Sequence, residues 1–332
     1  MPIADPAKTH LAKELKHERP LVCCRFSPTV PFAFAGSEDE SVLRWNLDTG
    51  AKTVLKGHES WVFALAASPD GSLLFSAGGD GRILWWPATA ENPTPARTLD
   101  AHAGWVNALA VSPDGTLIAS AGNDRLIRIW SIADGTLVCE LPSHERPVYC
   151  LRFLKESHNL LSADLFGRVV QWDLRPRKEA RRFDAAKLYK YEGGQGVDYG
   201  GVRDLDLSPD GTYLACSGLI EASNPLGAVS NPAVLAFDWQ QTKDPVLQRP
   251  KEDLKGVGWG VRCHPDGFHV MASGGTGGGF LWFFKPAEVN EFHKVGLPNT
   301  ARALDLHPDN LRIATAHHDG ALRIWSMSEK PA

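Results

Sequence analysis

Residues 57–86 read GHESWVFALAASPDGSLLFSAGGDGRILWW, and they contain the pattern of turns and strands from which the rest of the chain can be interpreted. Its Ser-Pro-Asp-Gly at 68–71 predicts a tight turn, because proline presets φ and glycine tolerates positive φ. The residues on both sides alternate between apolar and other side chains, which predicts two strands joined by that turn. The Gly/Asp-rich residues 78–81 predict a second turn, and a third strand then ends at Trp86.

The pattern recurs along the chain. Ser-Pro-Asp-Gly returns at 112–115 and 208–211, and variants of it occur elsewhere. With the proline position as anchor, successive copies are 41, 44, 42, 54, 56 and 43 residues apart. The anchors are Pro28, Pro69, Pro113, Lys155, Pro209, Pro265 and Pro308. Four intervals match the period of a four-stranded blade, and the two long ones predict insertions.

Seven such copies predict an all-β fold, a seven-bladed β-propeller of four-stranded antiparallel blades. The third strand of each copy ends in an aromatic residue: Trp45, Trp86, Trp130, Trp172, Phe237, Phe283 and Trp325. Copy seven stops after its third strand, whereas residues 9–15 precede copy one without a partner there. We expect this N-terminal strand to pair with the last blade and close the ring, which covers an open edge. Residues 9–327 then form one propeller, between tails at 1–8 and 328–332.

The sequence resembles the WD-repeat (WD40) β-propeller family over essentially its whole length. The resemblance rests on Gly57-His58 … Asp80 … Trp86, Ala101-His102 … Asp124 … Trp130 and Ser143-His144 … Trp172-Asp173. In that family a His, a Ser or Thr, an Asp and a Trp form a structural hydrogen-bond network in each blade. The resemblance implies this role for His58, Ser76, Asp80 and Trp86 in copy two, and for His102, Ser120, Asp124 and Trp130 in copy three.

The other copies depart from the pattern. Copy one has Ala35 in place of the hydroxyl. Copy four has Phe166 at the Asp position, with Asp164 two residues early. Copy seven has Thr315, but no matching His, and copies five and six have no recognisable network. The sequence therefore predicts that blades five and six are the least typical.

We expect no catalytic residues. Ser, His and Asp in one network are the residue types of a hydrolase, but no Gly-x-Ser-x-Gly motif accompanies them, and the set repeats in successive blades. The alternative is a propeller enzyme with its site at the central channel, where Asp204, Asp206 and Asp305 are expected near five arginines. These arginines are Arg25, Arg152, Arg203, Arg262 and Arg302. We interpret the charged residues as structural ion pairs.

The sequence also gives no reason to expect a metal or a cofactor. No HExxH motif or spaced Cys/His set is present. The glycine run at 274–279 lacks the Lys-Ser/Thr and the helix of a phosphate loop. Net charge is −4, so no overall positive field favours nucleic acid, and no apolar stretch is long enough to span a membrane. Six cysteines without a CxxC pair favour buried thiols in a reducing compartment, so we expect a monomeric cytoplasmic protein.

The function predicted is a non-catalytic scaffold that binds a protein or peptide partner. The resemblance places two insertions, at 184–200 and 218–231, on the same top face over blade five. Tyrosines and apolar residues in them, together with tryptophans near the first strands, are the candidate partner-binding residues. They are Trp61, Trp105, Tyr189, Tyr191, Tyr199, Leu219, Ile220, Leu226 and Trp259.

Two other interpretations stay open. Residues 175–190 hold seven basic residues against two acidic ones, a local charge of +5. This segment could contact an acidic partner or nucleic acid, but it is better explained as the solvated outer strand of blade four. The protein could also be a structural or sensory subunit of a larger assembly, which the sequence does not distinguish from a scaffold.

Overall fold

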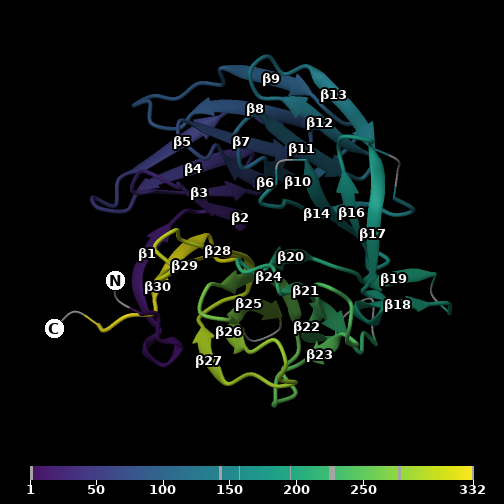
Figure 1. Ribbon diagram of the computed structural model, residues 1–332. Coiled ribbons are helices and arrows are strands. Elements are labelled where there is room, and N and C mark those ends of the chain that lie inside the picture. Colours follow the sequence, from purple (N-terminus) through teal and green to yellow (C-terminus); the bar gives the residue numbers. More distant parts are fainter. Residues whose placement is uncertain are drawn as a thin grey trace.

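The computed structural model describes residues 3–141, 144–156, 158–194, 196–223, 229–275 and 278–330. Seven four-stranded antiparallel sheets are arranged in a ring, so the predicted seven-bladed propeller is confirmed (Figure 1). In the described part of the chain the helices are two 3-10 turns, η1 (Pro6–Lys8) and η2 (Ala186–Leu188). None of the helices in these residues has the length and apolar character needed to cross a lipid bilayer.

Blades one to six each take four strands in chain order, from the inner strand at the channel to the outer strand at the rim, whereas blade seven takes its outer strand from the N-terminus. Blade one consists of β2 (Leu21–Phe26), β3 (Phe32–Ser37), β4 (Ser41–Asn46) and β5 (Lys52–Lys56). Blade two consists of β6 (Val62–Ala67), β7 (Leu73–Gly78), β8 (Arg82–Pro87) and β9 (Arg97–Asp100). Blade three consists of β10 (Val106–Val111), β11 (Leu117–Gly122), β12 (Ile127–Ser131) and β13 (Leu137–Leu141). Blade four consists of β14 (Val148–Phe153), β15 (Asn159–Asp164), β16 (Arg168–Asp173) and β17 (Lys178–Asp184). Blade five consists of β20 (Asp204–Leu207), β21 (Tyr213–Ile220), β22 (Asn231–Asp238) and β23 (Val246–Gln248). Blade six consists of β24 (Val257–His264), β25 (Phe268–Gly275), β26 (Gly278–Phe284) and β27 (His293–Leu297). Blade seven contains β28 (Ala301–Leu306), β29 (Arg312–His317) and β30 (Ala321–Ser326), and the N-terminal strand described next is its fourth.

The N-terminal strand closes the ring, as the sequence predicts. Strand β1 (His10–Lys16) pairs antiparallel with β30, and both termini of the chain lie beside this blade (Figure 1). Leu15 is buried, and the buried Arg323 guanidinium lies 2.8 Å from the Glu14 carboxylate across the junction. The last blade is therefore built from both ends of the sequence.

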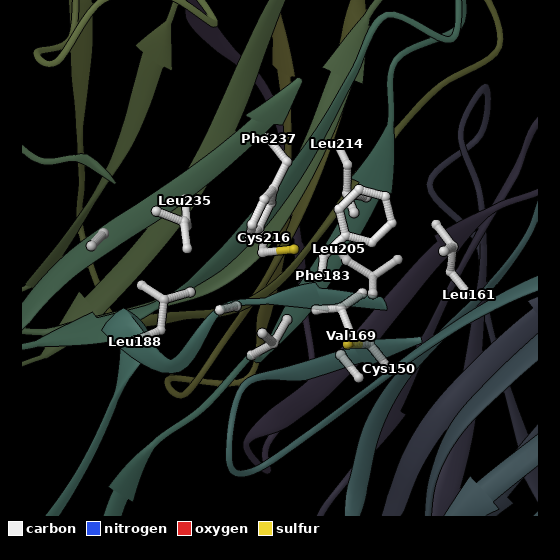
Figure 2. Close-up of a cluster of buried hydrophobic side chains, with 14 of the residues drawn as sticks. Cys150, Leu161, Val169, Phe183, Leu188, Leu205, Leu214, Cys216, Leu235 and Phe237 are labelled. Carbon is white, nitrogen blue, oxygen red and sulfur yellow. The ribbon is translucent and has the colours of Figure 1, made fainter. Parts of the chain in front are cut away.

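The cores lie between blades rather than within them. In the described residues, seven hydrophobic clusters occur, each joining two neighbouring blades. Figure 2 shows the cluster of blades four and five, where Phe183 from β17 packs with Leu205 and Cys216 of blade five. All six cysteines are free and buried in such apolar surroundings.

The two insertions differ in form. Between blades four and five, η2 leads into a hairpin of β18 (Tyr189–Glu192) and β19 (Val197–Gly200), which projects from the ring beside β17 (Figure 1). The second insertion is shorter than expected, because β21 extends to Ile220 and β22 begins at Asn231. Leu219 and Ile220 therefore lie buried in a strand rather than in an exposed loop, and Ile220 belongs to the same apolar cluster as Leu188 of η2.

Candidate functional site

The inner strands begin with a β-bulge, which decides what lines the channel opening. In six of the seven inner strands the pairing with the next strand shifts by one residue near the start, for example between Val62 and Ala64. A bulge leaves its extra residue unpaired and re-aims that side chain. In blade five, Arg203 precedes β20 at the equivalent position, and its N–H donates to the Ser217 carbonyl.

The seven residues at this position surround one cavity of about 130 Å³ at the top of the channel. We call them the channel mouth: Val22, Phe63, Asn107, Tyr149, Arg203, Trp259 and Arg302. We use "top face" for the face of the ring on which the inner strands begin. The mouth joins side chains from all seven blades, so it exists only in the closed ring.

One side of the mouth is aromatic. The Phe63 ring lies 6.2 Å from the Trp61 ring and 5.2 Å from the Trp105 ring, measured between centroids. Trp61 and Trp105 are 44% and 50% exposed, which is unusual for such large apolar side chains. We call these three residues the aromatic trio. The two tryptophans are among the residues predicted from the sequence, whereas Phe63, which joins them to the cavity, is not.

The opposite side of the mouth is cationic. The Arg203 guanidinium lies over the Tyr149 ring at 4.9 Å and over the Trp259 ring at 5.4 Å. Trp259 is half-buried within β24, at the bulge position of Phe63 rather than at the exposed position of Trp61. Arg302 forms an ion pair with Glu38.

A layer of ion pairs lies below the mouth. At the position three residues before each anchor the seven blades carry, in order, Arg25, Ala66, Ala110, Arg152, Asp206, Arg262 and Asp305. Arg152 lies 3.2 Å from Asp206, Arg262 lies 3.2 Å from Asp305, and Arg25 lies 2.9 Å from Asp305. Charges thus alternate across five neighbouring blades, from four through seven to one. We call this set the ion-pair layer.

The carboxylates of this region are paired with arginine, as expected of structural ion pairs. Burial alone would raise the pKa of Asp305, but Arg25, Arg262 and the Phe26 N–H hold it below its ordinary value. Burial raises the pKa of Asp206 in spite of Arg152 and Arg262. A second cavity, of about 290 Å³, lies at the other end of the channel and shares Arg25 and Arg262 with the first.

The hydrogen-bond networks of blades two and three are complete. His58 contacts Asp80 at 2.9 Å through Nδ1 and Ser76 Oγ at 2.7 Å through Nε2, and Trp86 Nε1 donates to Ser76 Oγ at 2.8 Å. In blade three the same contacts join His102, Asp124, Ser120 and Trp130 within 2.7–2.9 Å. These networks satisfy buried imidazole and indole groups, which would otherwise cost stability.

Blade four also has a complete network, contrary to expectation. Asp164, two residues early in the sequence, accepts from His144 Nδ1 at 2.8 Å through one carboxylate oxygen, and Ser162 contacts both His144 and Trp172. Asp164 lies at the end of β15, and its other carboxylate oxygen accepts from the Phe166 N–H. The carboxylate therefore reaches the histidine from the strand end instead of from the turn.

Blades six and seven keep parts of the network that the sequence pattern hid. In blade six, Trp282 Nε1 donates to Ser273 Oγ at 2.8 Å, so Trp282 and not the predicted Phe283 is the equivalent aromatic residue. In blade seven, His317 from β29 contacts Thr315 Oγ1 at 2.7 Å, in place of a histidine from the preceding loop. In blade five, Cys216 and Phe237 pack in the apolar cluster instead.

Two buried histidines predict a loss of stability in mild acid. Burial lowers the pKa of His269 to about 3 and that of His317 to about 4. In the unfolded chain each of these histidines binds a proton near pH 6.5. The stability that the two neutral histidines contribute to the folded protein is therefore present above pH 6.5 and is lost as the pH falls. We expect the free energy of unfolding to fall by about 2 kcal/mol per histidine between pH 7 and pH 5.

Urea denaturation at pH 7, 6 and 5 measures this effect. His269→Gln and His317→Gln should each flatten the pH dependence, whereas His318→Gln, at an exposed neighbouring position, should leave it unchanged. An unaltered pH dependence in both buried variants would contradict the assignment.

The hairpin and the second insertion meet over blade five. Lys190 Nζ donates to the Ala222 carbonyl at 2.8 Å, and Tyr189 donates its hydroxyl hydrogen to Asp198 at 2.6 Å. Burial, followed by the Asp198 hydrogen bond, raises the pKa of Tyr189 to about 12. Tyr191 is 57% exposed, whereas Tyr199 is partly buried. Leu226 lies outside the described residues.

The basic segment 175–190 is largely engaged within the protein. Arg181 lies 3.7 Å over the Trp239 ring, Arg182 pairs with Glu179, and Arg175 lies 3.0 Å from Asp173. Three of its basic residues, Lys178, Arg181 and Arg182, belong to β17, the outer strand of blade four. These contacts favour the solvated outer strand that the sequence predicts.

The closed ring of seven blades encloses a central channel. Blades two, three and four each carry a hydrogen-bonded set of His, Ser, Asp and Trp. Such sets are the feature by which the WD-repeat class of propeller is recognised. Four segments of the chain, residues 10–46, 51–87, 93–131 and 293–326, match the WD40 family, described as "WD domain, G-beta repeat". The chain is therefore a WD-repeat β-propeller.

Curated relatives match parts of the chain. The small ribosomal subunit protein RACK1y of Oryza sativa subsp. japonica is 49% identical over 70 residues, covering 20% of this chain and 21% of that protein. The transcription factor unc-37 of Caenorhabditis elegans is 37% identical over 46% of this chain and 18% of its own. Periodic tryptophan protein 2 of Arabidopsis thaliana is 31% identical over 64% of this chain and 22% of its own. The chain spans less than a quarter of the length of these relatives.

A solved structure titled "Structure of U3-55K" superimposes with a TM-score of 0.76 and covers 98% of this chain and 100% of its own. The two sequences are 18% identical, so this likeness shows the fold alone.

Proposed function

We propose that the protein is a non-catalytic scaffold that binds a protein or peptide partner across the top face of the propeller. The observation that carries the proposal is the exposed aromatic trio beside the channel cavity. Exposed aromatic side chains at the edge of a pocket are the usual anchors of protein interfaces. Relatives whose names include a ribosomal subunit protein and a transcription factor support a binding framework rather than a shared reaction.

The hairpin extends this surface toward blade five. It is held to the second insertion by the Lys190 hydrogen bond, so its exposed Tyr191 sits on a supported element. A supported surface loses less conformational entropy on binding than a free loop does. The binding surface we propose thus runs from the aromatic trio across the mouth to Tyr191. Six free thiols suit a reducing compartment, and we place the protein in the cytoplasm as a monomer.

Affinity purification with a double variant tests the proposal. Trp61→Ala with Trp105→Ala should lower the binding of specific partners by about 30-fold or more, as expected when hot-spot aromatic residues are removed. Leu137→Ala with Val138→Ala is the matched control, because these residues are as exposed but lie on outer strand β13. The affinities of recovered partners are then measured with the purified proteins.

Tyr191→Ser measures the contribution of the hairpin in the same assay. Partners that bind the double tryptophan variant and the wild type with equal affinity would show that the top face is not the binding surface.

A further inference from the structure

Arg203 is the one arginine of the mouth region without an acidic partner among the described residues. Arg302 pairs with Glu38, Arg25 pairs with Asp305, and Arg262 pairs with Asp204 and Asp305. The Arg203 side chain makes no ion pair or hydrogen bond in the described part of the chain, and its guanidinium contacts are the faces of Tyr149 and Trp259. Stacking fixes the plane of a guanidinium while leaving its N–H donors free.

Two buried donors at this place lack acceptors. Arg203 Nε and Trp259 Nε1 are both buried, and neither has a hydrogen-bond partner within the described residues. Buried donors without acceptors are costly, so native proteins satisfy nearly all of them. Both belong to one stacked pair that lines the same cavity. An acceptor supplied from outside the chain would satisfy this pair.

The charge around the cavity selects the kind of acceptor. Its lining includes Arg25, Arg203, Arg262 and Arg302 but a single acidic residue, Asp204. This is a positive site in a protein whose net charge is −4. The neighbouring acids Asp305 and Glu38 neutralise other arginines, so the uncompensated charge is that of Arg203. An anionic group is therefore favoured over a neutral or cationic one.

The geometry points to an acidic side chain of a partner peptide as the ligand. We propose that a carboxylate or phosphate group enters the mouth and binds the Arg203 guanidinium, which Tyr149 and Trp259 hold in place. Oxygen acceptors of this kind match the planar donor set of arginine. The aromatic trio on the opposite side then takes apolar residues next to the acidic one. This inference rests on the proposed top-face function and names the chemistry that the partner must carry.

The size of the cavity limits what can enter. A volume of about 130 Å³ corresponds to roughly four water molecules. One acidic side chain fits that space, whereas a folded element does not. The rest of the partner must therefore lie on the top face.

Peptide selection on the full chain provides the test. A phage library of random twelve-residue peptides is selected on the wild-type protein, and selected peptides are resynthesised with a fluorophore. Anisotropy gives the affinities of each peptide and of versions in which the conserved acid is replaced by its amide or by phosphoserine. The phosphoserine version shows whether carboxylate or phosphate is preferred.

We expect selected peptides to share an acidic position, and the amide version to bind the wild type at least about 30-fold more weakly. Arg203→Met should weaken the acidic peptide by a similar factor and leave the amide version unchanged. Arg312→Met is the matched control and should change either affinity less than about threefold, because Arg312 pairs with Asp309 at the turn between β28 and β29, away from the mouth. The Trp259 indole N–H resonance, assigned with Trp259→Phe, should shift when the acidic peptide binds.

The outcomes separate the two proposals. Peptides that lose binding with Trp61→Ala and Trp105→Ala but show no acidic preference would overturn the Arg203 assignment and leave the top-face function standing. An acidic preference that survives Arg203→Met would also overturn it. A selection that yields no peptide sensitive to the tryptophan variants would overturn both. If Arg203→Met fails to fold, the amide and acid peptides on the wild type still decide the question.

Discussion

Deletion of residues 1–16 is expected to lower the melting temperature by more than about 10 °C. The deletion removes β1, exposes the length of β30 as an open edge, and uncovers the apolar cluster that contains Leu15. It also removes Glu14, one of the two carboxylates that pair with Arg323, and leaves the pair with Asp319 in place. Burial of a leucine contributes about 2 kcal/mol, and the deletion removes the hydrogen bonds between β1 and β30 as well.

The matched control removes the other end of the chain. Of the residues that the structure describes, deletion of residues 329–332 takes away no strand and one exposed ion pair, between Lys8 and Glu329, so the melting temperature should change by less than about 2 °C. Differential scanning calorimetry measures both variants. Equal melting temperatures for the two truncations would mean that β1 does not hold the ring closed.

Arg262→Met is expected to cost about 3–5 kcal/mol of the free energy of unfolding. The Arg262 guanidinium is buried, and it pairs with Asp204 of blade five and Asp305 of blade seven. Burial alone would lower the pKa of this arginine, but the three surrounding aspartates raise it above its ordinary value. Methionine fills much of the volume, so the loss is mainly electrostatic: half-buried Asp204 loses its ion-pair partner among the described residues, and buried Asp305 keeps only Arg25.

Urea denaturation compares this variant with Arg182→Met, which removes the same type of side chain from the more exposed pair with Glu179. The control should cost less than about 1 kcal/mol. Adding Asp204→Asn to Arg262→Met should restore part of the stability, because Asp204 then no longer carries a charge without a partner, whereas Asp305 keeps Arg25. A loss in Arg262→Met no larger than in the control would show that the ion-pair layer does not stabilise the ring.

The sequence predicted the architecture because each blade repeats a local pattern. The anchors, including the degenerate Lys155, fall in the turns between first and second strands, and residues 9–15 fall in β1. Turn chemistry and period-two alternation are short-range signals, so one sequence is enough to find them.

The networks were harder to predict, because their geometry depends on how a turn is built. Asp164 reaches His144 from a strand end, and His317 approaches Thr315 along its own strand. Trp282 is nine residues after Ser273 instead of ten, which a fixed spacing does not find. Hydrogen bonds tolerate such changes in path, whereas a sequence pattern with fixed offsets does not.

The channel mouth was only partly predicted, although a signal existed. Its seven residues all lie six positions before the anchors, but they are not of one residue type. The predicted partner-binding residues followed the tryptophans and so included Trp259, whereas Arg203 was predicted only as one of the channel arginines and Tyr149 was not predicted. That these positions face one another follows from closure of the ring, which brings together residues from blades far apart in the chain.

The ion-pair layer also couples the two ends of the channel. Five neighbouring blades contribute a charged side chain to it, whereas blades two and three contribute Ala66 and Ala110. Arg25 and Arg262 line both the cavity at the mouth and the cavity at the other end of the channel. A substitution at either arginine therefore alters the walls of both cavities, so the two faces of the ring share part of their chemistry.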